Sequence, residues 1–296
     1  MTSAPRFARR HVRRLRAAVS LAAATAHAAP EAVSLQPHWH AGDKAVYRVA
    51  EKAGGLGSES AQDARRWILE VVEAAPDGYL ARWSPDGSPQ ESDAEGLQLR
   101  LDASAHPIEL LNWKTLADAA DKGISDTVKR HESRMSPEFR ADLLARMHAR
   151  HDTGPAALRS FGVLVSRLSA VLGRDYVLGR AVDAPVELSG MGGPRIAATG
   201  TWTLERLEHG RARVAWHAAH VLSAQETRLA LATMRAAAGL PAASSVPAHL
   251  PSCSVAETMT VDVDVATGWV LDLERVDTTS VEGRAPEVHA LSMQRE

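Results

Sequence analysis

Hydrophobic and polar residues alternate most regularly between residues 258 and 273. From Thr258 to Val265, every odd-numbered residue is apolar and every even-numbered residue is polar. A two-residue period of this kind is typical of a β-strand with one buried face. Turn-forming residues follow at 266–268, and apolar residues resume at every second position from Trp269. The pattern predicts an antiparallel hairpin with one face in water.

The same alternation predicts three further hairpins. In each of them, two alternating stretches are separated by residues that favour tight turns, such as Asp77-Gly78 and His209-Gly210. The three hairpins span residues 66–83, 97–110 and 201–216.

Two of these hairpins resemble each other. Each carries one tryptophan in each strand, Trp67 and Trp83 in the first and Trp202 and Trp216 in the second. Each is followed, at some distance, by a hairpin without such a pair. This order predicts an internal duplication with two related β units. The alternative is that any two alternating hairpins look alike.

Helix signals lie between and within the two β units. Ser136, which is followed by proline, has the properties of an N-cap. A Gly-Pro pair at 154–155 begins a long apolar stripe, which predicts one helix that is closed by Gly173. Ser223 and Glu226 have the spacing of a capping box, which predicts a third helix.

We therefore expect an α+β fold that is mostly antiparallel β, with a curved sheet covered by helices. This architecture is similar to that of periplasmic lipoprotein carriers at the level of the fold alone, because no motif matches residue by residue. The predicted organisation is a signal peptide at 1–28, a first β unit at 29–114, a helical segment at 115–173, a second β unit at 174–283 with an inserted helix at about 223–239, and a polar tail at 284–296.

The first 28 residues contain the three parts of a cleavable secretory signal peptide. The segment before the apolar run contains six arginines and no acidic residue. After the run, Ala26-His27-Ala28 provides a small-x-small cleavage sequence. The apolar run has about a dozen residues, whereas a membrane-spanning helix needs roughly 20. We expect a soluble protein without a transmembrane segment, periplasmic or secreted after cleavage near Ala28.

Cleavage would also change the charge of the protein. Loss of six arginines and no acidic residue takes the formal net charge from −2 to −8. An acidic protein lacks the positive surface that binds phosphate backbones, so nucleic acid is not an expected partner. Cys253 is the single cysteine and cannot form an internal disulfide, so we expect it to fill apolar space beside a strand.

Few residues fit a catalytic or metal-binding motif. His148 and His151 have a spacing that turns both rings toward one side of a helix, as a metal pair requires. No carboxylate or cysteine stands at a supporting spacing, and histidines near a helix C-terminus also favour the helix dipole. The glycine-rich segment 189–194 is expected to join two strands, whereas phosphate-binding loops lead into a helix. The sequence therefore predicts no catalytic residue, no cofactor and no metal site.

The placement of tryptophan bears most directly on function. Core packing explains tryptophans on the apolar faces of strands, but such rings also suit the wall of a cavity for a small apolar ligand. The favoured hypothesis is therefore a non-enzymatic periplasmic binding or carrier protein for a small apolar molecule. The alternatives are a structural or interaction module that meets another envelope protein, and, third, a hydrolase. The predicted cavity residues are Trp67, Trp83, Trp202, Trp216 and Trp269.

Overall fold

The alternating segments of the sequence form strands of one antiparallel sheet in the computed structural model. The structure describes residues 31–55, 58–61, 63–87, 96–132, 135–188, 195–237 and 250–296. The predicted signal peptide at 1–28 and the glycine-rich segment at 189–194 lie outside the described residues. The fold described below is that of the unit from Glu31 to Glu296.

Fourteen strands are described, and twelve of them form the large sheet. The order across this sheet is β7-β6-β5-β4-β2-β14-β13-β12-β11-β10-β9, with β3 paired to β2, while β1 and β8 form a second, two-stranded sheet. The strands are β1 (Ala32–Leu35), β2 (Lys44–Gly55), β3 (Ser58–Ala61), β4 (Arg65–Ala75), β5 (Gly78–Pro85), β6 (Leu97–Asp102), β7 (Pro107–Leu110), β8 (Arg174–Val177), β9 (Ala181–Leu188), β10 (Ile196–Glu208), β11 (Arg211–Val221), β12 (Cys253–Asp264), β13 (Val270–Val281) and β14 (Glu287–Arg295).

All four predicted hairpins are present, as β4-β5, β6-β7, β10-β11 and β12-β13. In β12, the odd-numbered residues Val261 and Val263 are fully buried, whereas Asp262 and Asp264 lie on the opposite, partly exposed face. The alternation therefore reports the two faces of the sheet, and the predicted α+β class with mostly antiparallel β structure is confirmed.

The prediction of a polar tail at 284–296 is wrong, because residues 287–295 form strand β14. This strand lies in the middle of the large sheet, with β13 on one side and β2 on the other. Its alternation is hidden in the sequence, because Glu287 and His289 occupy the same face as the buried Leu291 and Met293. A tail that reads as polar is thus the strand that joins the two groups of hairpins.

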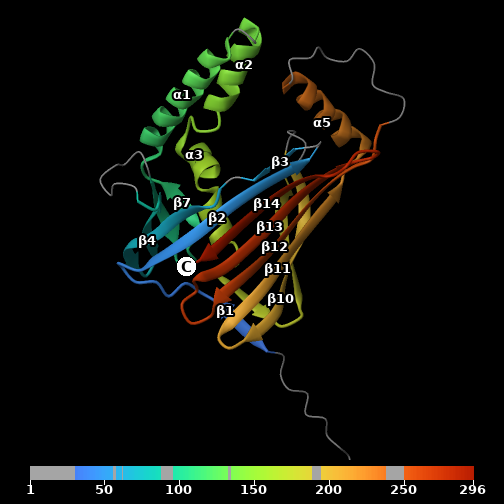
Figure 1. The fold of residues 1–296 in the computed structure, drawn as a ribbon. Coiled ribbons are helices and arrows are strands. Elements are labelled where there is room, and N and C mark those ends of the chain that lie inside the picture. The colour runs from blue at the N-terminus through green and yellow to red at the C-terminus, as the bar shows by residue number, and fades with distance from the viewer. Residues whose placement is uncertain are drawn as a thin grey trace, which may run out of the picture. The chain divides into compact units, whose positions relative to one another are not determined.

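Five helices are described, and α1, α2 and α3 lie together at one side of the large sheet (Figure 1). The predicted N-cap is confirmed, because Ser136 Oγ accepts a hydrogen bond of 3.1 Å from the N–H of Phe139. No helix among the described residues is both long enough and apolar enough to cross a membrane. The helices are α1 (Trp113–Arg130), α2 (Pro137–His148), α3 (Gly154–Phe161), α4 (Val163–Ser169) and α5 (Ala224–Ala237).

The single helix expected from 154 to Gly173 is also corrected, because Gly162 divides it into α3 and α4. The backbone ψ of Gly162 is 3°, outside the helical range, so the chain changes direction there. A side chain at Gly162 would press against the carbonyl oxygen of Leu158. The turn lets α4 leave the helix group and pack on the large sheet, where Val165 and Leu168 are buried in the core.

The tryptophan pairs of the two similar hairpins differ in register. Trp202 lies directly opposite Trp216, whereas Trp83 lies opposite Leu69 and Trp67 lies opposite Pro85. The internal duplication stays a prediction, and the different registers of the two tryptophan pairs give it no support.

Candidate functional site

Four of the five tryptophans predicted to line a cavity are at most 5% exposed, and Trp67 is half-buried. Trp67 stacks on Trp83, with ring centroids 5.5 Å apart and planes within 8°. Trp202 and Trp216 contact each other at 4.7 Å. The structure thus surrounds these rings mainly with other protein side chains, and their role as the wall of a ligand cavity stays a prediction.

Trp269 has a partner that the sequence did not indicate. Its indole stacks on that of Trp39, with ring centroids 4.3 Å apart. Trp39 is itself buried in the core, and the N–H of His38 donates to the carbonyl of Thr267 over 3.0 Å. The segment that contains Trp39 is therefore fixed against the β12-β13 turn.

An apolar groove of about 630 Å³ lies among the helices α1, α2 and α3. Its apolar side chains come from all three helices, because α1 and α3 cross and α2 packs against α1. Four polar groups also line it, from Thr127, Arg150, His151 and Ser160. The apolar lining includes Ile124, Val128, Leu143, Met147 and Phe161. Leu143 and Met147 of α2 therefore border this groove, and no residue of α2 is buried.

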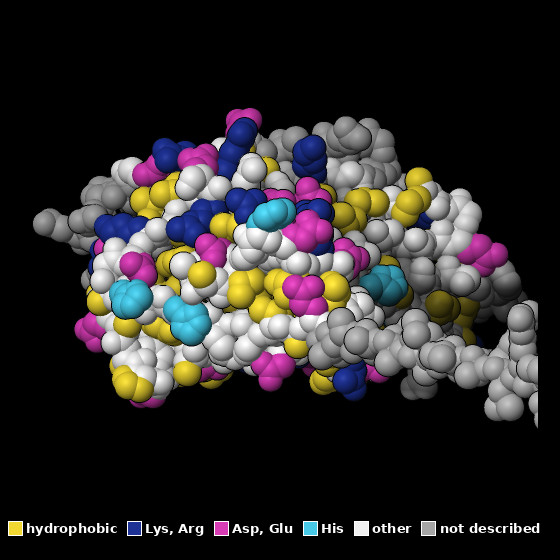
Figure 2. Space-filling view, turned by 90° about the horizontal axis from the view of Figure 1, so that it is seen from below, with side chains coloured by type: hydrophobic (Ala, Val, Ile, Leu, Met, Phe, Trp, Pro, Cys, Tyr) yellow, Lys and Arg dark blue, Asp and Glu magenta, His cyan; other side chains and the backbone are white. Residues whose placement is uncertain are grey.

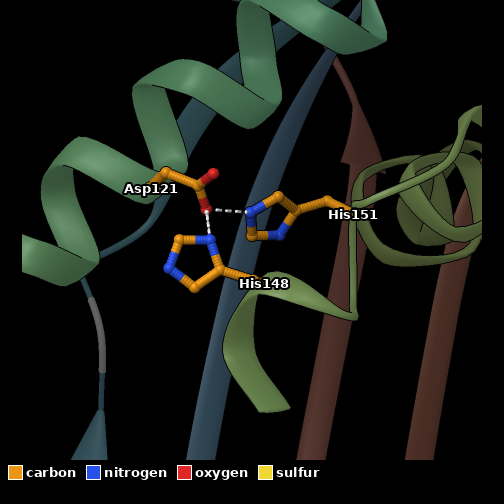
Figure 3. A group of neighbouring side chains, drawn as sticks. All are labelled: Asp121, His148 and His151. Carbon is orange, nitrogen blue, oxygen red and sulfur yellow. Dashed lines mark hydrogen bonds and ion pairs between the residues drawn. The ribbon is translucent and has the colours of Figure 1, made fainter. Parts of the chain in front are cut away.

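Two histidines and a carboxylate come together at His151, which also lines this groove (Figure 3). Asp121 projects from α1, His148 is the last residue of α2, and His151 lies in the turn before α3. One carboxylate oxygen, Asp121 Oδ1, lies 2.9 Å from Nδ1 of His148 and 2.5 Å from Nε2 of His151. The sequence pattern pointed to the two histidines but not to Asp121, because only the packing of α2 against α1 brings Asp121 near them.

The environments of the two imidazoles differ. The side chain of His151 is only 5% exposed and contacts the ring of Phe161, whereas that of His148 is 42% exposed. The hydrogen bond from His151 lowers the pKa of Asp121, and His148 contributes in the same direction. A carboxylate that is charged at neutral pH can only accept, so both rings present an N–H to it.

A second group of charged residues lies on the core-facing side of the sheet. His289, Asp277 and Glu257 occupy matching positions on β14, β13 and β12. Arg275 pairs with both carboxylates, while Arg167 approaches from α4. Burial, followed by the positive charge of Arg275, lowers the pKa of Arg167.

Asp277, His289 and Arg167 of this group line a second cavity of about 340 Å³, which lies between α4 and strands β2, β13 and β14. Its polar side chains include Glu51, Arg167, Asp277 and His289. The core-facing side of the sheet is therefore apolar around the tryptophans and charged near the start of β14.

One face of the molecule, shown in Figure 2, illustrates how charge is distributed on the surface. On the described part of this face, basic and acidic side chains lie next to each other and alternate with apolar ones. The described part of this face therefore carries no large patch of a single charge.

Comparison with known proteins adds little to this geometry. No protein-family model matches the chain, and no curated protein shows significant sequence similarity to it. A solved structure described as "Lipid-protein interactions in lipovitellin" aligns with 86% of this chain at 8% identity and a TM-score of 0.40. The chain spans 25% of the length of that structure. A likeness this low carries no argument about function.

Proposed function

We propose that this protein is an exported, non-enzymatic binding or carrier protein for a small apolar molecule, which it holds in the groove among α1, α2 and α3. The observation that supports this most directly is the groove itself. Its volume of about 630 Å³ falls within the range typical of small-molecule sites. Its lining is largely apolar with a few polar groups, which is the composition expected of such sites.

The polar groups indicate the form of the ligand. Arg150 and His151 lie together at one part of the lining, while Ile124, Leu143 and Met147 supply apolar surface. A molecule with an apolar body and one polar or acidic end matches this distribution, because each part then meets surface of its own kind. A fatty acid is the simplest probe with these properties.

Gly123 provides the sharpest test of this proposal. It lines the groove, and a Cβ atom added at this position would meet no atom within 4 Å apart from its chain neighbours and the nearby backbone of its own helix. A Gly123→Leu variant should therefore fill the groove without disturbing the core, and leucine also favours the helix more than glycine does. Lys122→Leu is the matched control, because it adds the same side chain at the neighbouring exposed position of α1.

The measurement is binding of N-phenylnaphthylamine, followed by its fluorescence, and displacement of this dye by palmitate. We expect the full chain and Lys122→Leu to bind the dye and release it to palmitate, and Gly123→Leu to bind at least about tenfold more weakly. Equal binding by all three proteins would place the ligand elsewhere. Loss of binding in Trp216→Leu alone would then identify the predicted tryptophan cavity as the site, and no binding by the full chain would reject a carrier function.

A further inference from the structure

The atoms of the His-Asp cluster match the ligands that transition metals prefer. Imidazole nitrogens and carboxylate oxygens bind Zn²⁺ at about 2.0–2.2 Å, in sites with four ligands arranged as a tetrahedron. The cluster offers one ligand atom from each of Asp121, His148 and His151, and these atoms all lie within 4.8 Å of one another. We propose that Asp121, His148 and His151 form a binding site for a divalent transition-metal ion, with Zn²⁺ as the probe.

The distances in the cluster are compatible with this assignment. Ligand atoms around a tetrahedral zinc ion lie about 3.4 Å apart, which follows from the bond lengths. Asp121 Oδ1 is 2.9 Å from His148 Nδ1 and 2.5 Å from His151 Nε2. Entry of an ion therefore requires each pair to separate by about 1 Å or less, which side-chain rotations can supply.

The backbone fixes where two of the three ligands stand. The N–H of His151 donates to the carbonyl of His148 over 3.0 Å, so the turn after α2 sets the spacing between the two rings. Thr153 then caps α3, because its Oγ1 accepts from the N–H of Ala156. Hydrogen bonds thus fix the loop between α2 and α3 at both ends. Binding of an ion should therefore cost little further conformational entropy of this loop.

The three protein ligands leave one coordination position for another group. His151 also lines the apolar groove, so this position is close to the space where a ligand would lie. A water molecule, or an acidic group on a bound molecule, would complete the tetrahedron. The metal proposal does not depend on the groove being occupied, because all three protein ligands are in place without it.

The ring N–H groups have to be rearranged before an ion can bind. In the absence of metal, the N–H groups of both rings point at Asp121, and an ion requires a lone pair at each of these nitrogens. Neutral imidazoles meet this requirement by moving the proton to the other ring nitrogen, whereas protonated imidazoles cannot bind. Entry of an ion therefore requires each ring to give up the N–H that points at Asp121.

The test uses the untagged full chain, because a polyhistidine tag would itself bind zinc. Zinc binding near neutral pH is measured by competition with a chromophoric chelator, and Co²⁺ is then substituted so that its visible absorption reports the geometry. We expect one equivalent of zinc to bind, and Asp121→Asn and His148→Ala each to weaken binding by about tenfold or more. Asp121→Asn keeps the shape of the side chain, and His148 is partly exposed, so both variants should fold.

His131→Ala is the matched control, because His131 is an exposed histidine at the end of α1 and lies outside the cluster. It should bind zinc as the unchanged chain does. The proposal is wrong if the chain binds no zinc with one-to-one stoichiometry, or if Asp121→Asn and His148→Ala bind it as tightly as His131→Ala. The cluster would then serve only as a hydrogen-bonded contact between α1 and the turn after α2. Dye binding is measured separately without metal, so failure of one proposal is distinguishable from failure of the other.

Discussion

Gly200 in β10 shows how one residue determines the packing of a tryptophan. It lies opposite Ala218 of β11, and the ring of Trp216 covers it, because a Cβ atom at Gly200 would overlap the carbon atoms of that ring. Glycine in a strand interior usually weakens the strand, since it has no side chain to pack. Here the absence of a side chain at Gly200 leaves the space that the Trp216 ring occupies when it contacts Trp202.

Gly200→Ala should therefore lower the free energy of unfolding by about 1–3 kcal/mol, because the buried indole has to move aside. Gly54→Ala in β2 is the comparison, since a side chain there would meet only the carbonyl oxygen of Val288 at 3.9 Å. Chemical denaturation followed by tryptophan fluorescence measures both. If the two substitutions change stability equally, Trp216 does not depend on Gly200.

At the same scale, the candidate site shows what a sequence pattern can and cannot predict. The spacing of His148 and His151 suggested two rings on one side of a helix, but the sequence predicted no metal site, and His151 lies in the turn after α2. Asp121 is 27 positions before His148 and belongs to another helix, so neither periodicity nor spacing relates it to them. Only the packing of α2 against α1 places its carboxylate against both rings.

The elements of the fold were predicted best where one face is apolar and the other polar throughout. The stretch from Thr258 to Asp264 in β12 fits this description, while α2 and α5 were predicted from their N-terminal caps. Strand β14 does not, since the core-facing side of the sheet is charged at its start. The division between α3 and α4 was missed for a different reason, because the apolar stripe continues through Gly162 while the direction of the backbone changes.

The start of α5 illustrates how a predicted cap acts electrostatically. The N–H of Ser223 donates to the Glu226 carboxylate over 2.7 Å, and Ser223 Oγ accepts from the N–H of Glu226 over 3.3 Å. The backbone N–H of Ser223 is the main cause that lowers the pKa of Glu226 to about 2, and the Ser223 hydroxyl and His220 add to it. Because these bonds favour the charged carboxylate, the cap stabilises the fold above the ordinary pKa of 4.5 and is lost as the pH falls toward 2.

We therefore expect Glu226 to remain ionised at about pH 3, where ordinary glutamates are protonated. Carbon-detected NMR of the side-chain carboxyl measures this directly. In Ser223→Ala, the midpoint should move toward 4.5 without reaching it, because the backbone N–H still donates. A midpoint near 4.5 in the unchanged chain would mean that the capping box does not form in solution.

Across the described unit, β14 connects the two groups of hairpins into one sheet. It pairs with β2 through Val288 to Arg295 and with β13 through Glu287 to Gln294. Leu291 and Met293 also contribute buried side chains to the core. Without this strand, β2 and β13 would each become an unpaired edge, and the core would open between them.

A chain that ends at residue 286 should consequently lose its fixed tertiary structure, which near-ultraviolet circular dichroism would show as a loss of tryptophan signal. A synthetic peptide of residues 287–296 should restore this signal by adding the missing strand. The same peptide with Leu291→Asp and Met293→Asp should not, because it cannot enter the core. A truncated chain with an unchanged spectrum would contradict a joining role for β14.

The central position of β14 also sets the order in which the protein is able to assemble. It follows every other strand of the sheet along the chain, yet β2, among the first, depends on it for one of its neighbours. Pairing between such distant segments is slow, since a long loop has to close before any contact forms. The first group of hairpins therefore waits with β2 open on one side until β14 is available. The interval before β14 arrives is the period when this protein is most exposed to aggregation.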